Sequence, residues 1–170
     1  MAYIGIISDT HGFSDSRVMD FLRPVEQIWH AGDFGSMQCL DRVCVFKKDF
    51  LGVYGNCDDY HIRQRVPYMQ EFVCEGKHVL MMHIGGYPGR YDLRAVRLIE
   101  AYRPDIFVCG HSHILRVMND RHYGMLVINP GAAGISGFHN VRTAVRFHID
   151  DGNIHDMEVG EWTKSIDSQF

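Results

Sequence analysis

The amino-acid sequence predicts an α/β fold in which two β-sheets pack face to face and helices cover their outer faces. Its first half repeats one unit three times: an apolar strand, a loop rich in Gly, Asp and Asn, and a more polar stretch of helical character. The second half consists mainly of short strands separated by turn residues. Parallel strand–helix units followed by a strand-rich segment favour two packed sheets over one.

Three continuous apolar runs, at residues 3–8, 25–30 and 51–54, form the predicted parallel strands of the first half. Uninterrupted apolar runs of this length suit strands that are covered on both faces. Each run ends in a polar loop. Because open α/β sheets place ligands at the carboxyl ends of their strands, these loops are the predicted position of a site.

The second half begins with a predicted hairpin, formed by residues 69–74 and 78–83, and continues with a helix at residues 93–102. A buried strand at residues 106–109 then runs into a Gly-His-Ser-His loop. The remaining strands are expected to be antiparallel, because turn residues separate them, and they fall at residues 115–119, 125–129, 141–149 and 154–159.

Length and composition exclude several classes of protein. A chain of 170 residues is expected to form one domain, residues 1–170. The net charge of −4 and the lack of a basic run disfavour a dedicated nucleic-acid binder. The apolar start is too short for a signal sequence, and no later segment approaches the roughly 20 apolar residues of a membrane span. We therefore expect a cytoplasmic protein that has no membrane partner.

Cysteine and histidine usage points to a metal site without thiolates. The five cysteines form no CxxC pair, which argues against a disulfide framework or a thiolate zinc site and fits a reducing cytosol. The eleven histidines are an excess for this length, and imidazole is the commonest transition-metal ligand.

The predicted metal donors occupy five loops, each at the end of an apolar run: Asp9-x-His11, Gly32-Asp33, Gly55-Asn56, His83 and Gly110-His111-x-His113. Taken alone, each is as well explained as a helix cap, a turn residue or a hydrogen-bonded core group. Two divalent cations roughly 3.5–4 Å apart need a bridging carboxylate, imidazoles and an oxygen donor, and the set supplies all of them. In extended backbone, the two imidazoles of His111-x-His113 are expected to reach one cluster.

These motifs, together with Asn129-Pro-Gly-Ala, resemble the signature of the calcineurin-like metallophosphoesterases over residues 3 to about 159. More narrowly they resemble the small YfcE-like phosphodiesterases, whose eukaryotic relative is vacuolar sorting protein 29. The resemblance implies a four-layer αββα sandwich of two mixed β-sheets flanked by helices. It also implies two divalent metal ions, Mn²⁺ first, with Fe, Zn, Ni or Co as alternatives. One metal is then held by Asp9, His11, Asp33 and His113, and Asp33 bridges to a second held by Asn56, His83 and His111.

The implied activity is hydrolysis of a small phosphodiester by a metal-activated water, with Asn56 and His111 among the catalytic residues. Cys57 stands where many larger relatives carry a histidine that protonates the leaving group. We interpret Cys57 as a packing residue in preference to a thiol proton donor. Asp58 is the alternative donor, or a residue that orients a ligand. Tyr87 and Arg90 are interpreted as part of a solvated turn.

Three alternatives stay open from the sequence: a phosphomonoesterase, a non-catalytic metal-binding scaffold of the same fold, and a di-metal hydrolase of another ester or amide class. The complete donor set argues against the scaffold. The third class usually carries a His-x-His-x-Asp-His run, and the sequence His111-Ser-His113-Ile-Leu lacks the continuing Asp-His. Exposed apolar strands in the second half leave a homo-oligomer open as well.

Overall fold

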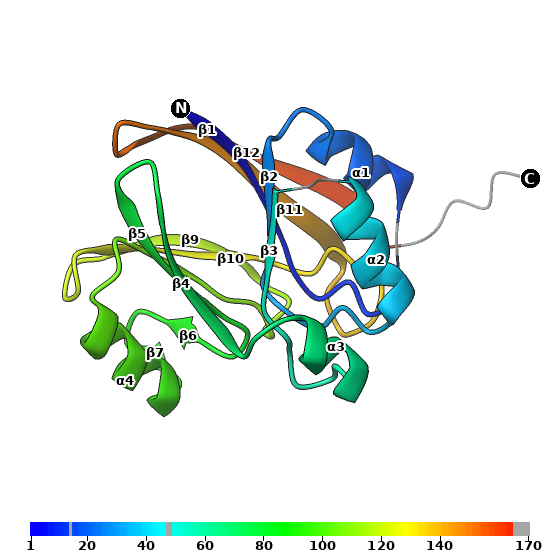
Figure 1. Ribbon diagram of the computed structural model, residues 1–170, viewed down its shortest axis with the longest axis horizontal. Coiled ribbons are helices and arrows are strands. Elements are labelled where there is room, and N and C mark those ends of the chain that lie inside the picture. Colours follow the sequence, from blue (N-terminus) through cyan, green and yellow to red (C-terminus); the bar gives the residue numbers. More distant parts are fainter. Residues whose placement is uncertain (14, 47–48, 165–170) are drawn as a thin grey trace, which may run out of the picture.

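The structure, a computed structural model, describes residues 1–13, 15–46 and 49–164. Two five-stranded sheets pack face to face, and helices lie on both outer faces (Figure 1). Each sheet contains both parallel and antiparallel strand pairs. The predicted α/β sandwich of two mixed sheets flanked by helices is therefore confirmed.

The first sheet has the strand order β12-β11-β1-β2-β3. Its parallel part consists of β1 (Ala2–Ile7), β2 (Gln27–His30) and β3 (Asp49–Gly52), which are the three apolar runs of the first half. The chain returns to this sheet at its end, where β11 (Val141–Asp150) pairs antiparallel with β1 and β12 (Asn153–Thr163) pairs antiparallel with β11.

The second sheet has the order β4-β5-β8-β10-β9, with bounds Met69–Cys74, Lys77–Met82, Ile106–Val108, Met125–Pro130 and Leu115–Asp120 in that order. Strand β10 pairs antiparallel with β9, as expected, but it also pairs in parallel with β8, so the later strands are not all antiparallel. In the β9–β10 hairpin, the apolar strand β10 takes the buried inner position, and the more polar β9 lies at the edge. A short ribbon, β6 (Gly86–Tyr87) with β7 (Arg90–Tyr91), occupies the predicted turn.

Four helices cover the sandwich within the described ranges. Helices α1 (Ser16–Leu22) and α2 (Met37–Phe46) cover the first sheet, and α4 (Leu93–Tyr102) covers the second sheet on the opposite side (Figure 1). Helix α3 (Tyr60–Arg65) packs against α2. The predicted helix at residues 93–102 matches α4 in both bounds. None of the helices in the described part of the chain is long and apolar enough to cross a membrane.

Trp29 anchors the core between the two sheets. Its indole is completely buried and meets Phe147 of the first sheet and Phe72 of the second in edge-on contacts, with ring centroids 6.1 and 5.1 Å away. The indole nitrogen is satisfied as well, because it donates a hydrogen bond of 2.6 Å to Gln27 Oε1. A single side chain thus joins the apolar surfaces of both sheets.

We expect Trp29→Ala to lower the free energy of unfolding by about 3–5 kcal/mol, because it leaves a cavity between the sheets. Urea denaturation measures this loss. Phe138→Ala is the matched control, since Phe138 is fully exposed and its removal is expected to change stability by no more than about 0.5 kcal/mol. Equal losses in the two variants would contradict the role given to Trp29.

Candidate metal centre

The structure brings six of the seven predicted metal ligands together at one end of the sandwich. Asp9, His11 and His113 form one group, in which one donor atom of each residue lies within 4.8 Å of the others. Asp33, His83 and His111 form a second group by the same measure. Asp33 also forms an overlapping group with His11 and Cys57, so its carboxylate links the second group to His11 of the first.

Five of these donors have left-handed backbone: Asp9, His11, Asp33, His111 and His113, with φ between 47° and 70°. Such conformations cost about 1–3 kcal/mol each in residues other than glycine, and they are concentrated at functional sites. The expectation of extended backbone at His111-x-His113 is therefore wrong. The turned backbone directs His111 toward Asp33 and His113 toward Asp9, so the two imidazoles belong to different donor groups that line the same cavity.

The carboxylate of Asp9 is buried and only half satisfied. Its Oδ2 accepts hydrogen bonds from Ser8 Oγ at 2.7 Å and from the His111 amide at 3.0 Å. Its Oδ1 lies 3.2 Å from His113 Nε2 but has no hydrogen-bond partner among the described residues. Burial opposes ionisation, yet His113, His83 and Ser8 hold the pKa of Asp9 below its ordinary value. An ionised, buried oxygen without a partner is a place where a cation would be strongly favoured.

The carboxylate of Asp33 stands between the two groups. Its Oδ1 accepts a hydrogen bond of 2.8 Å from the Cys57 amide, and its Oδ2 lies 3.1 Å from His83 Nε2. His11 Nε2 is 3.7 Å from Asp33 Oδ2 and also 3.7 Å from Asp9 Oδ1. Burial opposes ionisation here too, but His83 and the Cys57 amide lower the pKa of Asp33 to about 2. Both central carboxylates are therefore ionised at neutral pH.

The hydrogen bonds of His83 direct a lone pair at the carboxylates. Its Nδ1 lies 2.7 Å from the Ala31 carbonyl, which can only accept, so Nδ1 carries the proton in the neutral ring. Nε2 is then unprotonated, and it is buried without a hydrogen-bond partner among the described residues. Burial disfavours the imidazolium, yet Asp33 and Asp9 raise the pKa of His83. The surroundings thus favour a positive charge at Nε2, which a proton or a metal ion can supply.

His139, which was not among the predicted site residues, orients His113 in the same way. His139 Nε2 donates to the Gly134 carbonyl at 2.8 Å, which leaves His139 Nδ1 free to accept from His113 Nδ1 at 3.2 Å. In the neutral ring the proton then lies on His113 Nδ1, and the Nε2 lone pair is 3.3 Å from His11 Nε2. Burial lowers the pKa of His111, which favours its neutral form. Several imidazole nitrogens with free lone pairs close to one another are suited to binding a cation.

A cavity of about 460 Å³ opens over the donors, lined by His11, Asp33, Asn56, Cys57, His111 and His113 among others. Asn56, the seventh predicted ligand, is exposed there, and its amide donates to Cys57 Sγ at 3.5 Å. Cys57 was expected to be a packing residue, but it is exposed at this cavity. Partial desolvation and the Asp33 charge raise the pKa of Cys57, so the thiol keeps its proton at neutral pH.

Asp58 joins two of the donor loops. Its buried carboxylate accepts three backbone hydrogen bonds, from the amides of Asp33, Gly35 and Gly55 at 3.0, 2.9 and 2.8 Å. It is not among the residues that line the cavity. Of the two roles that the sequence allowed, orienting a ligand therefore fits this geometry better than donating a proton to a substrate.

His30, which the sequence did not mark as functional, joins the Asp33 loop to the Asp9 loop. Its Nδ1 accepts from the Gly32 amide at 3.1 Å, so Nε2 carries the proton and bonds Thr10 Oγ1 at 3.0 Å. The ring stacks on Phe34 with centroids 3.7 Å apart. Complete burial lowers the pKa of His30 to about 3. A neutral imidazole thus holds the loops that carry Asp9 and Asp33.

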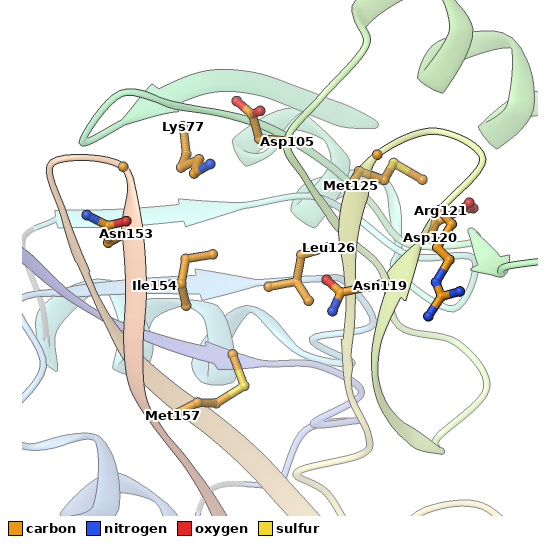
Figure 2. Close-up of a pocket in the computed structure, with 12 residues that line it drawn as sticks. Lys77, Asp105, Asn119, Asp120, Arg121, Met125, Leu126, Asn153, Ile154 and Met157 are labelled. Carbon is orange, nitrogen blue, oxygen red and sulfur yellow. The ribbon is translucent and has the colours of Figure 1, made fainter.

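Two other features contribute nothing to this centre. Tyr87 and Arg90 do not line the cavity, and the Tyr87 ring instead lies 3.9 Å from the Arg116 guanidinium. A larger cavity of about 630 Å³ is lined by Leu126 of the second sheet and by Ile154 and Met157 of the first (Figure 2). Its two carboxylates already accept hydrogen bonds, Asp105 from the His78 amide at 2.8 Å and Asp120 from the Tyr91 hydroxyl at 2.6 Å. No group of three metal donors among the described residues belongs to that cavity.

Fold and donor set together define a metal-binding protein of the αββα class, with buried donor atoms that fit divalent cations. The chain matches the calcineurin-like phosphoesterase superfamily domain over residues 3–152 and belongs to that superfamily. A protein of Methanothermobacter thermautotrophicus, described as a "probable metallophosphoesterase", is 32% identical over 137 residues, covering 76% of each chain.

Solved structures show the same fold. Vps29 of Entamoeba histolytica complexed with Zn²⁺ has a TM-score of 0.72 at 16% identity and covers 96% of this chain and 99% of its own. A structure described as a novel archaeal phosphodiesterase has a TM-score of 0.73 at 19% identity and covers 92% of this chain and 99% of its own. At these identities the likeness establishes the fold alone.

We expect Asp58→Ala to weaken divalent metal binding by about 10–100-fold, because the amides that hold the Asp33 loop lose their common acceptor. Competition with a chelating indicator measures this affinity. Asp58→Asn retains one acceptor oxygen, so its metal affinity is expected to lie between that of the unaltered chain and that of Asp58→Ala. Unchanged metal affinity together with lost turnover would instead support Asp58 as a proton donor.

The depressed pKa of His30 predicts acid sensitivity. Its folded pKa of about 3 lies below the ordinary value of 6.5, so the unfolded chain binds a proton that the folded chain does not. Above the ordinary pKa, protonation of His30 does not reduce the free energy of unfolding. Below it, the free energy of unfolding falls as the pH falls, by about 1.4 kcal/mol per pH unit. Urea unfolding between about pH 6 and pH 5 should therefore be less pH-dependent in His30→Gln. Identical slopes in the two proteins would contradict this.

Proposed function

We propose that this chain is a dinuclear metal-dependent phosphodiesterase that hydrolyses small phosphodiesters. The observation that carries the proposal is the position of Asp33, whose carboxylate belongs to one donor group and lies within 4.8 Å of His11 in the other. Asp9, His11 and His113 would hold one ion with Asp33, and Asn56, His83 and His111 would hold the other. Nitrogen and oxygen donors suit Mn²⁺ first and Fe, Zn, Ni or Co as alternatives. When bound, the metals lower the pKa of a coordinated water and offset the charge of a phosphoryl group.

The chain's own residues prepare the site for this chemistry. The ionised Asp9 and Asp33 supply the negative charge that retains the cations, and His83 and His113 present unprotonated nitrogens to them. We propose that Asn56 and His111, at the cavity surface, contact the phosphoryl oxygens as well as a metal. Asp58 acts in catalysis by holding the Asp33 loop in place.

The site offers little help to a poor leaving group. The Asp58 carboxylate accepts hydrogen bonds from backbone amides and does not line the cavity. The Cys57 thiol does line the cavity, but its raised pKa makes it a weak acid. Substrates whose leaving group needs no protonation should therefore react fastest. This supports a phosphodiesterase whose substrates carry activated leaving groups over a phosphomonoesterase that acts on alkyl esters.

Its five cysteines are free thiols, which supports a reducing, cytoplasmic location.

A non-catalytic scaffold is the second candidate, and one observation favours it. Phe138 is fully exposed and Ile114 is half exposed, and both line the cavity over the donors. Exposed apolar side chains beside a metal site suit the docking of another protein. Turnover of a diester by the isolated chain would decide between the two functions.

We expect metal-stripped protein to regain hydrolysis of bis-p-nitrophenyl phosphate on addition of Mn²⁺, at a higher rate than hydrolysis of p-nitrophenyl phosphate. Asp33→Ala and His111→Ala should each lose at least about 100-fold in turnover, because each removes a proposed ligand. His61→Ala is the matched control, since His61 is an exposed histidine outside both donor groups. Folded, Mn²⁺-loaded protein without activity on either compound would favour the scaffold.

A further inference from the structure

A separate group of metal donors lies on the β11–β12 hairpin, in the sheet whose strand β1 leads to Asp9. It consists of His148, His155 and Asp156, each of which places one donor atom within 4.8 Å of the others. His148 and His155 are direct cross-strand partners. Side chains opposite each other on neighbouring strands lie on the same face of a sheet, so the two imidazoles approach each other.

A β-bulge brings the carboxylate to the same place. Arg146 pairs with Glu158 and His148 pairs with His155, so two residues of β12 oppose one residue of β11. Neighbours in a regular strand point to opposite faces, which would separate Asp156 from His155. The extra residue and the left-handed backbone of Asp156 (φ 51°) redirect its side chain, and Asp156 Oδ2 lies 2.9 Å from His155 Nδ1. The bulge thus turns a histidine pair into a three-donor group.

His148 is held in place but is not satisfied. Its ring stacks between Tyr3, with centroids 3.9 Å apart and planes within 13°, and His155, with centroids 5.4 Å apart and planes within 10°. Its Nδ1 is buried and has no hydrogen-bond partner among the described residues. A buried polar atom without a partner costs about 1–3 kcal/mol. A bound cation would remove that cost without requiring the stacked ring to move far.

This group is well separated from the proposed catalytic centre. His148 pairs with Tyr3 near the start of β1, whereas Asp9 follows the end of that strand. At about 3.3 Å per residue, the strand places the two sites about 20 Å apart. Binding at the hairpin is therefore independent of the ligands of the catalytic centre and of the function proposed for it.

We propose that His148, His155 and Asp156 form a surface binding site for one late first-row transition-metal ion, with Zn²⁺ as the representative ion. Two imidazoles and one carboxylate suit Zn²⁺, Ni²⁺ or Cu²⁺, whereas Mg²⁺ and Ca²⁺ prefer oxygen donors alone. His155 and Asp156 are exposed, so the remaining coordination positions face solvent.

Equilibrium dialysis of the metal-free full chain against Zn²⁺ tests this site by counting bound ions. We expect His155→Ala and Asp156→Asn each to lose one equivalent of Zn²⁺, or to bind it at least about tenfold more weakly. The matched control His61→Ala should bind as many ions as the unaltered chain. Because His155 and Asp156 are exposed, both variants should fold, which circular dichroism verifies.

Asp33→Ala separates this proposal from the proposed function. It disturbs the catalytic centre, yet it should keep the Zn²⁺ equivalent that His155→Ala loses. His155→Ala should in turn keep Mn²⁺-dependent diester hydrolysis, if the chain has it. Equal Zn²⁺ stoichiometry and affinity in the unaltered chain, His155→Ala and Asp156→Asn would overturn the site, whatever the outcome of the activity assay.

Discussion

The two buried carboxylates, Asp9 and Asp33, impose the constraint on which the rest of the structure depends. They share the imidazoles of His11 and His83 as neighbours, and both are held in the ionised form. Concentrated buried negative charge is unfavourable unless hydrogen bonds and cations offset it. The backbone amides of Cys57 and His111 supply part of that offset. Unprotonated imidazole nitrogens complete an arrangement that suits bound metal.

Neither sheet could build this centre alone. Asp9 and Asp33 follow strands β1 and β2 of the first sheet, whereas His83 and His111 follow β5 and β8 of the second. The core around Trp29 therefore fixes the distance between the donors as well as the stability of the fold. The loops are then joined to one another by buried polar groups, and the strain of the left-handed donors is offset by that network.

Much of this architecture is readable from local sequence. Continuous apolar runs predicted the parallel strands, and the apolar spacing in residues 93–102 predicted α4. The polar residues at the ends of the runs were the predicted metal donors. The position of β10 between β8 and β9 was missed, because hairpin strands do not reveal which of them is buried until both are packed. The roles of His30, Asp58 and His139 were missed or left open, because they rest on hydrogen bonds that form only in the folded chain. The turned backbone of His111 and His113 was missed for the same reason.

Anomalous diffraction from crystals of the chain soaked in Mn²⁺ tests the central claim most directly, because it locates each ion without reference to activity. A dinuclear centre bridged by Asp33 predicts two peaks about 3.5–4 Å apart with the Asp33 carboxylate between them, one beside His113 and the other beside His83. A single peak, or two peaks that do not share Asp33, would contradict a dinuclear centre bridged by that residue.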